Sequence, residues 1–85
     1  MSTRIIRCIV AELDHKDEPN LLGVRIRCTE EQQENGDHCA EAERLCSKQG
    51  GDPMLVFDEN NYSGSSMLGL FDWDKVDIVD ITQRS

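Results

Sequence analysis

The stretches Arg4–Leu13, "RIIRCIVAEL", and Leu21–Cys28, "LLGVRIRC", decide the fold of this chain. The first is rich in β-branched residues and the second alternates apolar and polar positions, so both are expected to be strands. The polar residues 14–20 between them include Pro19, which favours a loop. The sequence therefore predicts an antiparallel hairpin.

The expected register of this hairpin pairs Leu13 with Leu21. It points the apolar side chains of both strands toward the core: Ile6, Cys8, Val10, Val24, Ile26 and Cys28. On the other face it places Arg7 opposite Arg27, among aliphatic side chains. Such a mixed face is expected to meet either solvent or an acidic surface.

A helix is expected after the hairpin. Thr29 stands three residues before Gln32, which is the pattern of a capping box. Asp37 is the better N-cap candidate, because good helix formers fill residues 38–49 and the Gly50-Gly51 pair then ends the run. The sequence predicts one main helix here.

Three short strands are expected in the second half, at Met54–Phe57, Ser65–Phe71 and Val76–Thr82. The order is then β-β-α-β-β-β with tight loops. This order predicts a single α+β domain over residues 1–85, with an antiparallel sheet and one helix packed on one of its faces.

The segment Phe57–Gly64 supports a turn between two of these strands. Phe57, Tyr62 and Gly64 resemble the aromatic-x4-aromatic-x-Gly hairpin of βγ-crystallin modules. The resemblance covers about eight residues and one motif. It implies a folded hairpin in which the two rings pack together, and it implies neither the crystallin fold nor calcium binding.

The cysteines and histidines form no recognised metal or catalytic motif. Cys39 and Cys46 are two helical turns apart, a rise of about 10 Å, whereas structural zinc sites present their ligands in tight pairs. Adjacent residues such as His38 and Cys39 point about 100° apart on a helix. Cys39 lies at a helix start, where a thiol pKa can fall, and is the one candidate nucleophile. We expect no catalytic residue, metal ligand or cofactor, and four buried thiols that include Cys8 and Cys28.

The size and the charge of the chain limit the classes of function that it can have. A chain of 85 residues buries only about 60–65% of its unfolded surface, which favours a binding module over a deep enzymatic cleft. A secretory signal and a long apolar run are both missing, so a cytoplasmic location without membrane contact is expected. The net charge of −8, concentrated in residues 29–85, repels nucleic acid and attracts basic proteins. The alternative is that the acidity serves only solubility.

Two acidic segments are the candidate partner-binding site. Their residues are Glu30, Glu31, Glu34, Asp72, Trp73, Asp74 and Asp77. An aromatic side chain flanked by carboxylates suits a basic protein partner, because the ring supplies buried area and the acids orient the encounter. The alternative is that Trp73 belongs to the core and the acids are simply solvated.

These observations favour a non-enzymatic protein-binding module with a basic protein partner. A narrower hypothesis is an inhibitor that blocks a nucleic-acid-binding protein, its carboxylates standing in for phosphates. Phages and mobile elements encode small acidic inhibitors of this class, including anti-CRISPR proteins and DNA mimics, and the analogy is one of class alone. The alternative is a homodimeric ligand-binding protein or enzyme, with its site at the subunit interface near Arg7, Arg25 or Arg27.

Overall fold

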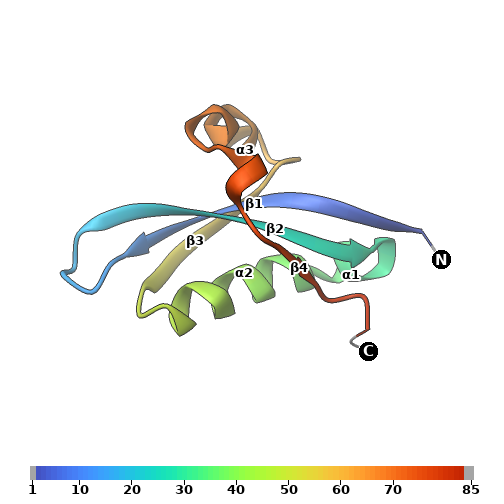
Figure 1. The fold of residues 1–85 in the computed structure, drawn as a ribbon, viewed down its shortest axis with the longest axis horizontal. Coiled ribbons are helices and arrows are strands. Elements are labelled where there is room, and N and C mark those ends of the chain that lie inside the picture. Colours follow the sequence, from blue (N-terminus) through green and yellow to red (C-terminus); the bar gives the residue numbers. More distant parts are fainter. Residues whose placement is uncertain (1, 84–85) are drawn as a thin grey trace.

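A computed structural model describes residues 2–83 and shows a four-stranded mixed sheet (Figure 1). The strands are β1 (Thr3–Leu13), β2 (Pro19–Thr29), β3 (Asp52–Asp58) and β4 (Ile78–Asp80), in the spatial order β3-β1-β2-β4. β1 is antiparallel to β2 and β3, whereas β4 runs parallel to β2. The α+β class is confirmed, but the expectation of a purely antiparallel sheet is wrong.

Three α-helices and two 3₁₀ turns complete the fold. The helices are α1 (Glu30–Asn35), α2 (Asp37–Lys48) and α3 (Tyr62–Met67), and the 3₁₀ turns are η1 (Leu68–Leu70) and η2 (Trp73–Lys75). In Figure 1, α1 and α2 lie below the sheet and α3 lies above it. Within residues 2–83, no helix has the length and apolarity that a membrane crossing requires.

The β1–β2 hairpin forms as expected, but its register differs from the expected one by two residues. Leu13 pairs with Pro19 rather than with Leu21. The reason is the loop, which is shorter than expected: one Asp14 carboxylate oxygen accepts the N–H groups of Lys16 at 2.8 Å and Glu18 at 3.0 Å. A shift of two residues keeps every side chain on its original face.

The core therefore contains the apolar residues that the alternation predicts. One buried cluster forms this core, and each of its side chains is at most 2% exposed except Val24, at 7%. Its members are Ile6, Cys8, Val10, Val24, Ile26, Cys28, Ala42, Cys46 and Ile81. α2 contributes Ala42 and Cys46 to it, and the segment after β4 contributes Ile81. The helix thus covers one face of the sheet.

The first helix turn is capped as its pattern predicts. The Thr29 hydroxyl accepts the Gln32 N–H at 3.1 Å, and the Gln32 side chain accepts the Thr29 N–H at 2.9 Å. The Gln32 amide also donates to the Ile81 carbonyl at 2.6 Å, so the cap holds the C-terminal segment. Gly36 then separates α1 from α2 with a left-handed φ of 78° and occupies the N-cap of α2, the place expected for Asp37.

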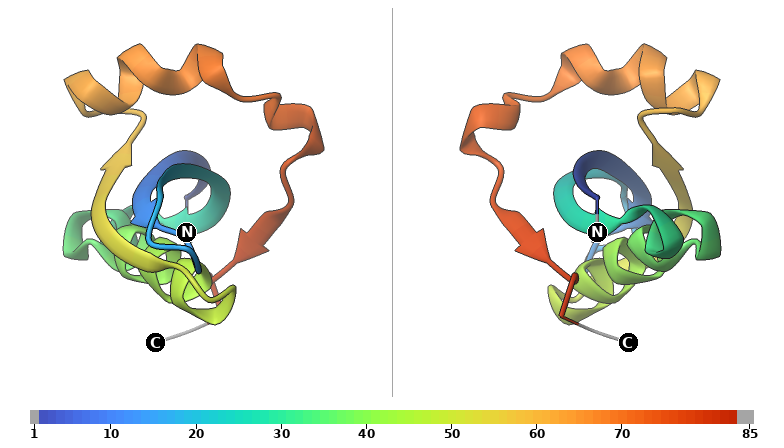
Figure 2. Two further views of the ribbon diagram at one scale, coloured as in Figure 1. Left: turned by 90° about the vertical axis from the view of Figure 1, so that its left-hand side faces the viewer. Right: turned by 90° about the vertical axis from the view of Figure 1, so that its right-hand side faces the viewer.

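Residues 59–77, here called the arm, arch over the sheet face opposite α2 (Figure 2). The expected strand Ser65–Phe71 is wrong, because this segment forms the second half of α3 and all of η1. The Asn61 side chain accepts the N–H groups of Ser63 at 2.9 Å and Gly64 at 3.4 Å, and this capping starts a helix instead of a hairpin. Tyr62 is 89% exposed, so the expected ring contact with Phe57 is also wrong.

A second, smaller apolar cluster lies under the arm. Ile9 is fully buried on this face and pairs with Gly23 on β2 and with Phe57 on β3. The Phe71 ring lies over Gly23, where an added Cβ would stand only 2.8 Å from the ring. The Phe71 ring centre is 5.2 Å from that of Trp73. Gly23 thus makes room for the aromatic residues that hold the arm in place.

Candidate functional site

The arginine face of the hairpin is bound by the chain's own arm. The Arg7 backbone N–H and guanidinium both donate to the Glu59 carboxylate, at 2.9 and 3.2 Å, and the guanidinium lies 6.0 Å from the Trp73 ring centre. The Arg25 guanidinium donates to the Val76 carbonyl through two nitrogens. The arm therefore covers this face through one carboxylate and one backbone carbonyl.

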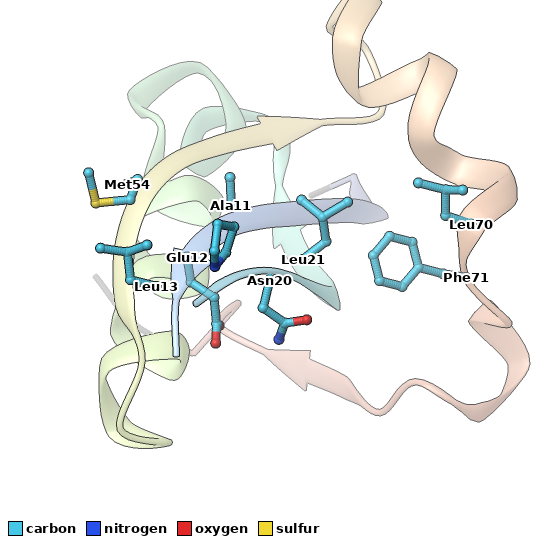
Figure 3. Close-up of a pocket in the computed structure, with 9 residues that line it drawn as sticks. Ala11, Glu12, Leu13, Asn20, Leu21, Met54, Leu70 and Phe71 are labelled. Atoms are coloured by element: carbon cyan, nitrogen blue, oxygen red, sulfur yellow. The ribbon is translucent and has the colours of Figure 1, made fainter. Parts of the chain in front are cut away.

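Figure 3 shows an open apolar groove at the end of the hairpin next to loop 14–18. Its volume is about 590 Å³, and it is lined by Ala11, Glu12, Leu13, Pro19, Asn20, Leu21, Met54, Leu70 and Phe71. We call this surface the groove. Met54 comes from β3 on one side of it and Leu70 and Phe71 from the arm on the other.

The groove is bordered by apolar side chains that remain in solvent. Met54 and Leu55 on β3 are each 60% exposed, and Leu70 on the arm is 68% exposed. β3 is also an edge strand of the sheet. Exposed apolar residues around a hollow beside a strand edge are typical of interaction surfaces. The groove could not be predicted from the sequence, because its apolar residues have the pattern of buried strand residues.

The first predicted acidic segment forms a surface patch at the far end of the hairpin. Glu30, Glu31 and Glu34 are exposed on α1 and, with Ser2 and Thr29, line a shallow hollow of about 320 Å³. The Arg4 guanidinium lies 3.8 Å from the Glu30 carboxylate, a surface contact that contributes little to stability. We call the three glutamates the α1 patch.

The second predicted acidic segment lies in the arm. Asp72, Asp74 and Asp77 are exposed, whereas Trp73 is half-buried and its indole N–H donates to the Leu68 carbonyl at 2.9 Å. Trp73 thus helps to hold the arm, and it is not one of the core residues. The views in Figures 1 and 2 place this segment and the α1 patch well apart, so the structure does not bring the two acidic segments together.

A third candidate is a polar cluster between the start of α2 and the end of β3. The His38 Nε2 atom lies 3.0 Å from an Asp58 carboxylate oxygen and 3.5 Å from the Cys39 sulfur. The His38 side chain is 4% exposed and that of Asp58 is 22% exposed. His38 Nδ1 is buried, and no described residue hydrogen-bonds to it. We call these three residues the His–Cys–Asp cluster.

Cys39 and Asp58 in this cluster have pKa values shifted in opposite directions. Burial alone would raise the pKa of Asp58, but hydrogen bonds from His38 and from the Asn60 and Asn61 N–H groups lower it below its ordinary value. The pKa of Cys39 is raised, mainly by burial and then by the nearby Asp58 carboxylate. The suggestion that the helix start lowers the Cys39 pKa is therefore wrong.

The cluster is not arranged as a nucleophile with a proton relay. In such a relay the imidazole uses one nitrogen for the nucleophile and the other for the carboxylate. Here the Cys39 sulfur and the Asp58 oxygen both lie against Nε2. One nitrogen cannot serve both contacts in a relay, and the Cys39 thiol remains protonated at neutral pH because its pKa is raised.

The other three cysteines are buried free thiols, as the sequence predicts. Cys46 donates to a Glu12 carboxylate oxygen at 3.1 Å, and burial together with this carboxylate raises the pKa of Cys46 to about 11. Burial likewise raises the pKa of Cys8 and of Cys28. Cys39 differs because it is only half-buried and lies in the polar cluster.

Comparison with known proteins adds no assignment, since no family model, curated protein or solved structure matches this chain.

Proposed function

We propose that this protein is a non-enzymatic binding module that holds an extended, basic segment of a protein partner in the groove. The observation that carries the proposal is the open groove of about 590 Å³ beside the edge strand β3. Apolar contact in the groove would supply most of the affinity, and the acidic surface would attract the partner.

The apolar part of the proposal follows from exposure. Met54, Leu55 and Leu70 are each at least 60% exposed. Burial of one large apolar side chain contributes about 1.5–3 kcal/mol. An extended segment lying over the ends of β1 and β2 would place its apolar side chains between Met54 and the arm.

The charge of the module supports a basic partner. The net charge of the chain is −8. Exposed Asp52 begins β3, and exposed Asp72 follows Phe71 directly in the arm. Carboxylates around an apolar centre speed the encounter with a cationic segment and disfavour an anionic one.

The test uses two designed peptides, one alternating Leu with Lys and the other alternating Leu with Glu. Fluorescence anisotropy should show that the lysine peptide binds and the glutamate peptide does not. Leu70→Asn and Met54→Gln should each weaken binding about tenfold, in line with about 1.4 kcal/mol of lost apolar contact. The matched control is Tyr62→Ser, an exposed arm residue outside the groove, which should bind normally. Equal binding of both peptides, or of all variants, would contradict the proposal.

The narrower proposal is an inhibitor whose carboxylates displace nucleic acid from its partner. It is supported by the exposure of the arm acids Asp72, Asp74 and Asp77 and of the α1 patch. It predicts that the captured partner releases nucleic acid when this protein binds, and that charge reversal of the three arm acids abolishes the release. A complex of unchanged strength between low and high salt would exclude it.

The homodimer alternative has less support. Its expected pocket needs available guanidinium groups, but Arg7 binds Glu59 and Arg25 binds the Val76 carbonyl. Arg27 lies 3.8 Å from the Asp80 carboxylate. We therefore do not propose a ligand site on this face.

A further inference from the structure

We propose that His38, Cys39 and Asp58 form a binding site for a single divalent transition-metal ion of the zinc type. The site is separate from the groove. It joins the first turn of α2 to the last residue of β3, and its three ligand atoms are the His38 Nε2, the Cys39 sulfur and an Asp58 carboxylate oxygen.

The first argument is the convergence of three unlike ligand atoms on one point. All three lie within 4.8 Å of one another. Bond lengths to zinc of about 2.0–2.3 Å and a tetrahedral angle require ligand atoms about 3.3–3.6 Å apart. The observed separations of 3.0 Å for nitrogen and oxygen and 3.5 Å for nitrogen and sulfur are close to these values. The sulfur and the Asp58 oxygen lie within 4.8 Å of each other, so this third pair would close by up to about 1.2 Å to hold an ion.

The second argument is the use of His38. An imidazole that only stabilises a fold usually places its two polar neighbours on different nitrogens. Here the carboxylate and the thiol both face Nε2. A side chain that is 4% exposed and aims one nitrogen at both a carboxylate and a thiol places that nitrogen where a metal ligand would stand.

The third argument is that hydrogen bonds from neighbouring backbone groups orient the Asp58 carboxylate. One of its carboxylate oxygens accepts the N–H groups of Asn60 and Asn61, both at 3.0 Å. This leaves the other oxygen facing His38. Such hydrogen bonds from outside the ligand set fix the direction of a metal-binding carboxylate.

The chemistry of the set selects the class of ion. Nitrogen, sulfur and oxygen together suit Zn²⁺ and its neighbours Co²⁺ and Ni²⁺, whereas Ca²⁺ and Mg²⁺ prefer oxygen alone. Binding would release one proton from the Cys39 thiol, and the thiolate and the Asp58 carboxylate would then balance the two positive charges. The partial exposure of Cys39 and Asp58 leaves room for water as a fourth ligand.

Affinity should be lower than at a closed site with four protein ligands. When Nε2 binds the ion, the proton of the neutral imidazole moves to Nδ1, which is buried and has no acceptor among the described residues. An unsatisfied buried donor weakens binding by about one to two orders of magnitude. The site therefore suits an ion that is exchanged or sensed.

The test is titration of the reduced, full-length protein with Co²⁺. One equivalent should bind and produce a thiolate-to-cobalt charge-transfer band with the visible bands of tetrahedral cobalt. Cys39→Ser should remove the charge-transfer band. The matched controls are Cys46→Ser, a thiol outside the cluster, and His15→Gln, the chain's other histidine, and both should keep it. Only the spectrum of hydrated cobalt in the wild type, or an unchanged band in Cys39→Ser, would overturn the proposal.

A second measurement needs no variant and so does not depend on folding of a mutant. Iodoacetamide alkylation followed by mass spectrometry should modify Cys39 first, because it is the one half-buried thiol. Excess Zn²⁺ should slow this reaction at least tenfold and leave the other three cysteines as they were. Equal alkylation of Cys39 with and without Zn²⁺ would show that its sulfur is not a ligand.

Discussion

The contact between the arm and the end of β3 provides the sharpest test of the fold. Gly64 in α3 is buried against the β3 end. A Cβ at this position would overlap the Asp58 carbonyl oxygen and stand 2.9 Å from its carbonyl carbon. Gly69, five residues later in the same arm, would place an added Cβ in open space. Gly64→Ala and Gly69→Ala therefore make the same chemical change in opposite surroundings.

The expected cost of Gly64→Ala follows from these contacts. Carbon and oxygen normally stay about 3.3–3.6 Å apart, so the helix must move away by on the order of 1 Å. Overpacking of this kind costs about 1–3 kcal/mol, and each weakened backbone hydrogen bond, such as that from Asn61 to Asp58, costs about 0.5–1.5 kcal/mol. We expect a total loss of about 2–4 kcal/mol. Gly69→Ala should instead stabilise the protein by about 0.4–1 kcal/mol, because it restricts the unfolded chain.

Urea denaturation followed by circular dichroism measures both variants. With a slope of about 1 kcal/mol per molar urea for a chain of this size, the midpoint of Gly64→Ala should fall by about 2–4 M. That of Gly69→Ala should rise slightly. Midpoints that agree within about 0.5 M would refute the close packing of α3 on Asp58, and with it the placement of the arm.

Three further predictions concern the hairpin face, a buried thiol and acid stability. Arg25→Gln should cost about 1–3 kcal/mol in thermal unfolding, because the Val76 carbonyl loses a charged donor, whereas Arg27→Gln at an exposed ion pair should cost less than about 1 kcal/mol. Cys46 should resist alkylation at pH 9 in the folded protein and react at once in urea, since its pKa is raised to about 11. The pKa of Asp58 is lower in the folded state than in the unfolded chain, so its contribution to stability is complete above about pH 4 and disappears as the pH falls through the folded value. Urea midpoints measured from pH 6 to pH 2 should therefore fall more steeply for the wild type than for Asp58→Asn, and parallel curves would count against the reasoning.

Which side chains lie on each face of the hairpin could be predicted, because apolar and polar residues alternate along the strands with a period of two. The register could not, because it depends on how loop 14–18 closes. Asp14 uses its side chain to bind the N–H groups of Lys16 and Glu18, and this shortens the loop by two residues relative to the expectation. Both registers satisfy the same alternation, so hydrophobic pattern alone cannot separate them.

The arm lay outside what the pattern could predict. Its apolar residues suit a strand, yet the Asn61 cap and the close approach of Gly64 to Asp58 favour a helix, and both depend on tertiary contacts. The groove depends in turn on the arm, since Leu70 and Phe71 form one of its walls. Local propensity gives way to packing of this kind.

The His–Cys–Asp cluster shows a different limit. An angle of about 100° between neighbouring helix residues describes the directions of their Cβ atoms. It does not exclude a meeting of the side-chain ends, and His38 Nε2 reaches to 3.5 Å from the Cys39 sulfur. The third member, Asp58, comes from a strand 19 positions further along the chain from Cys39, and the packing of α2 against β3 brings it close. In the sequence, the adjacent His38 and Cys39 were the one indication of this cluster.

The pairing of β4 with β2 has a consequence for the rate of folding. β1 and β2 adjoin each other along the chain, whereas Ile78 must find Arg25 across more than half of it. Closing so long a loop is slow relative to forming a hairpin, so the contacts of β4 and of the arm should form after the transition state. Substitutions in residues 59–80 should then accelerate unfolding and leave the folding rate almost unchanged. The strand that completes the sheet would thereby determine how long the native state lasts.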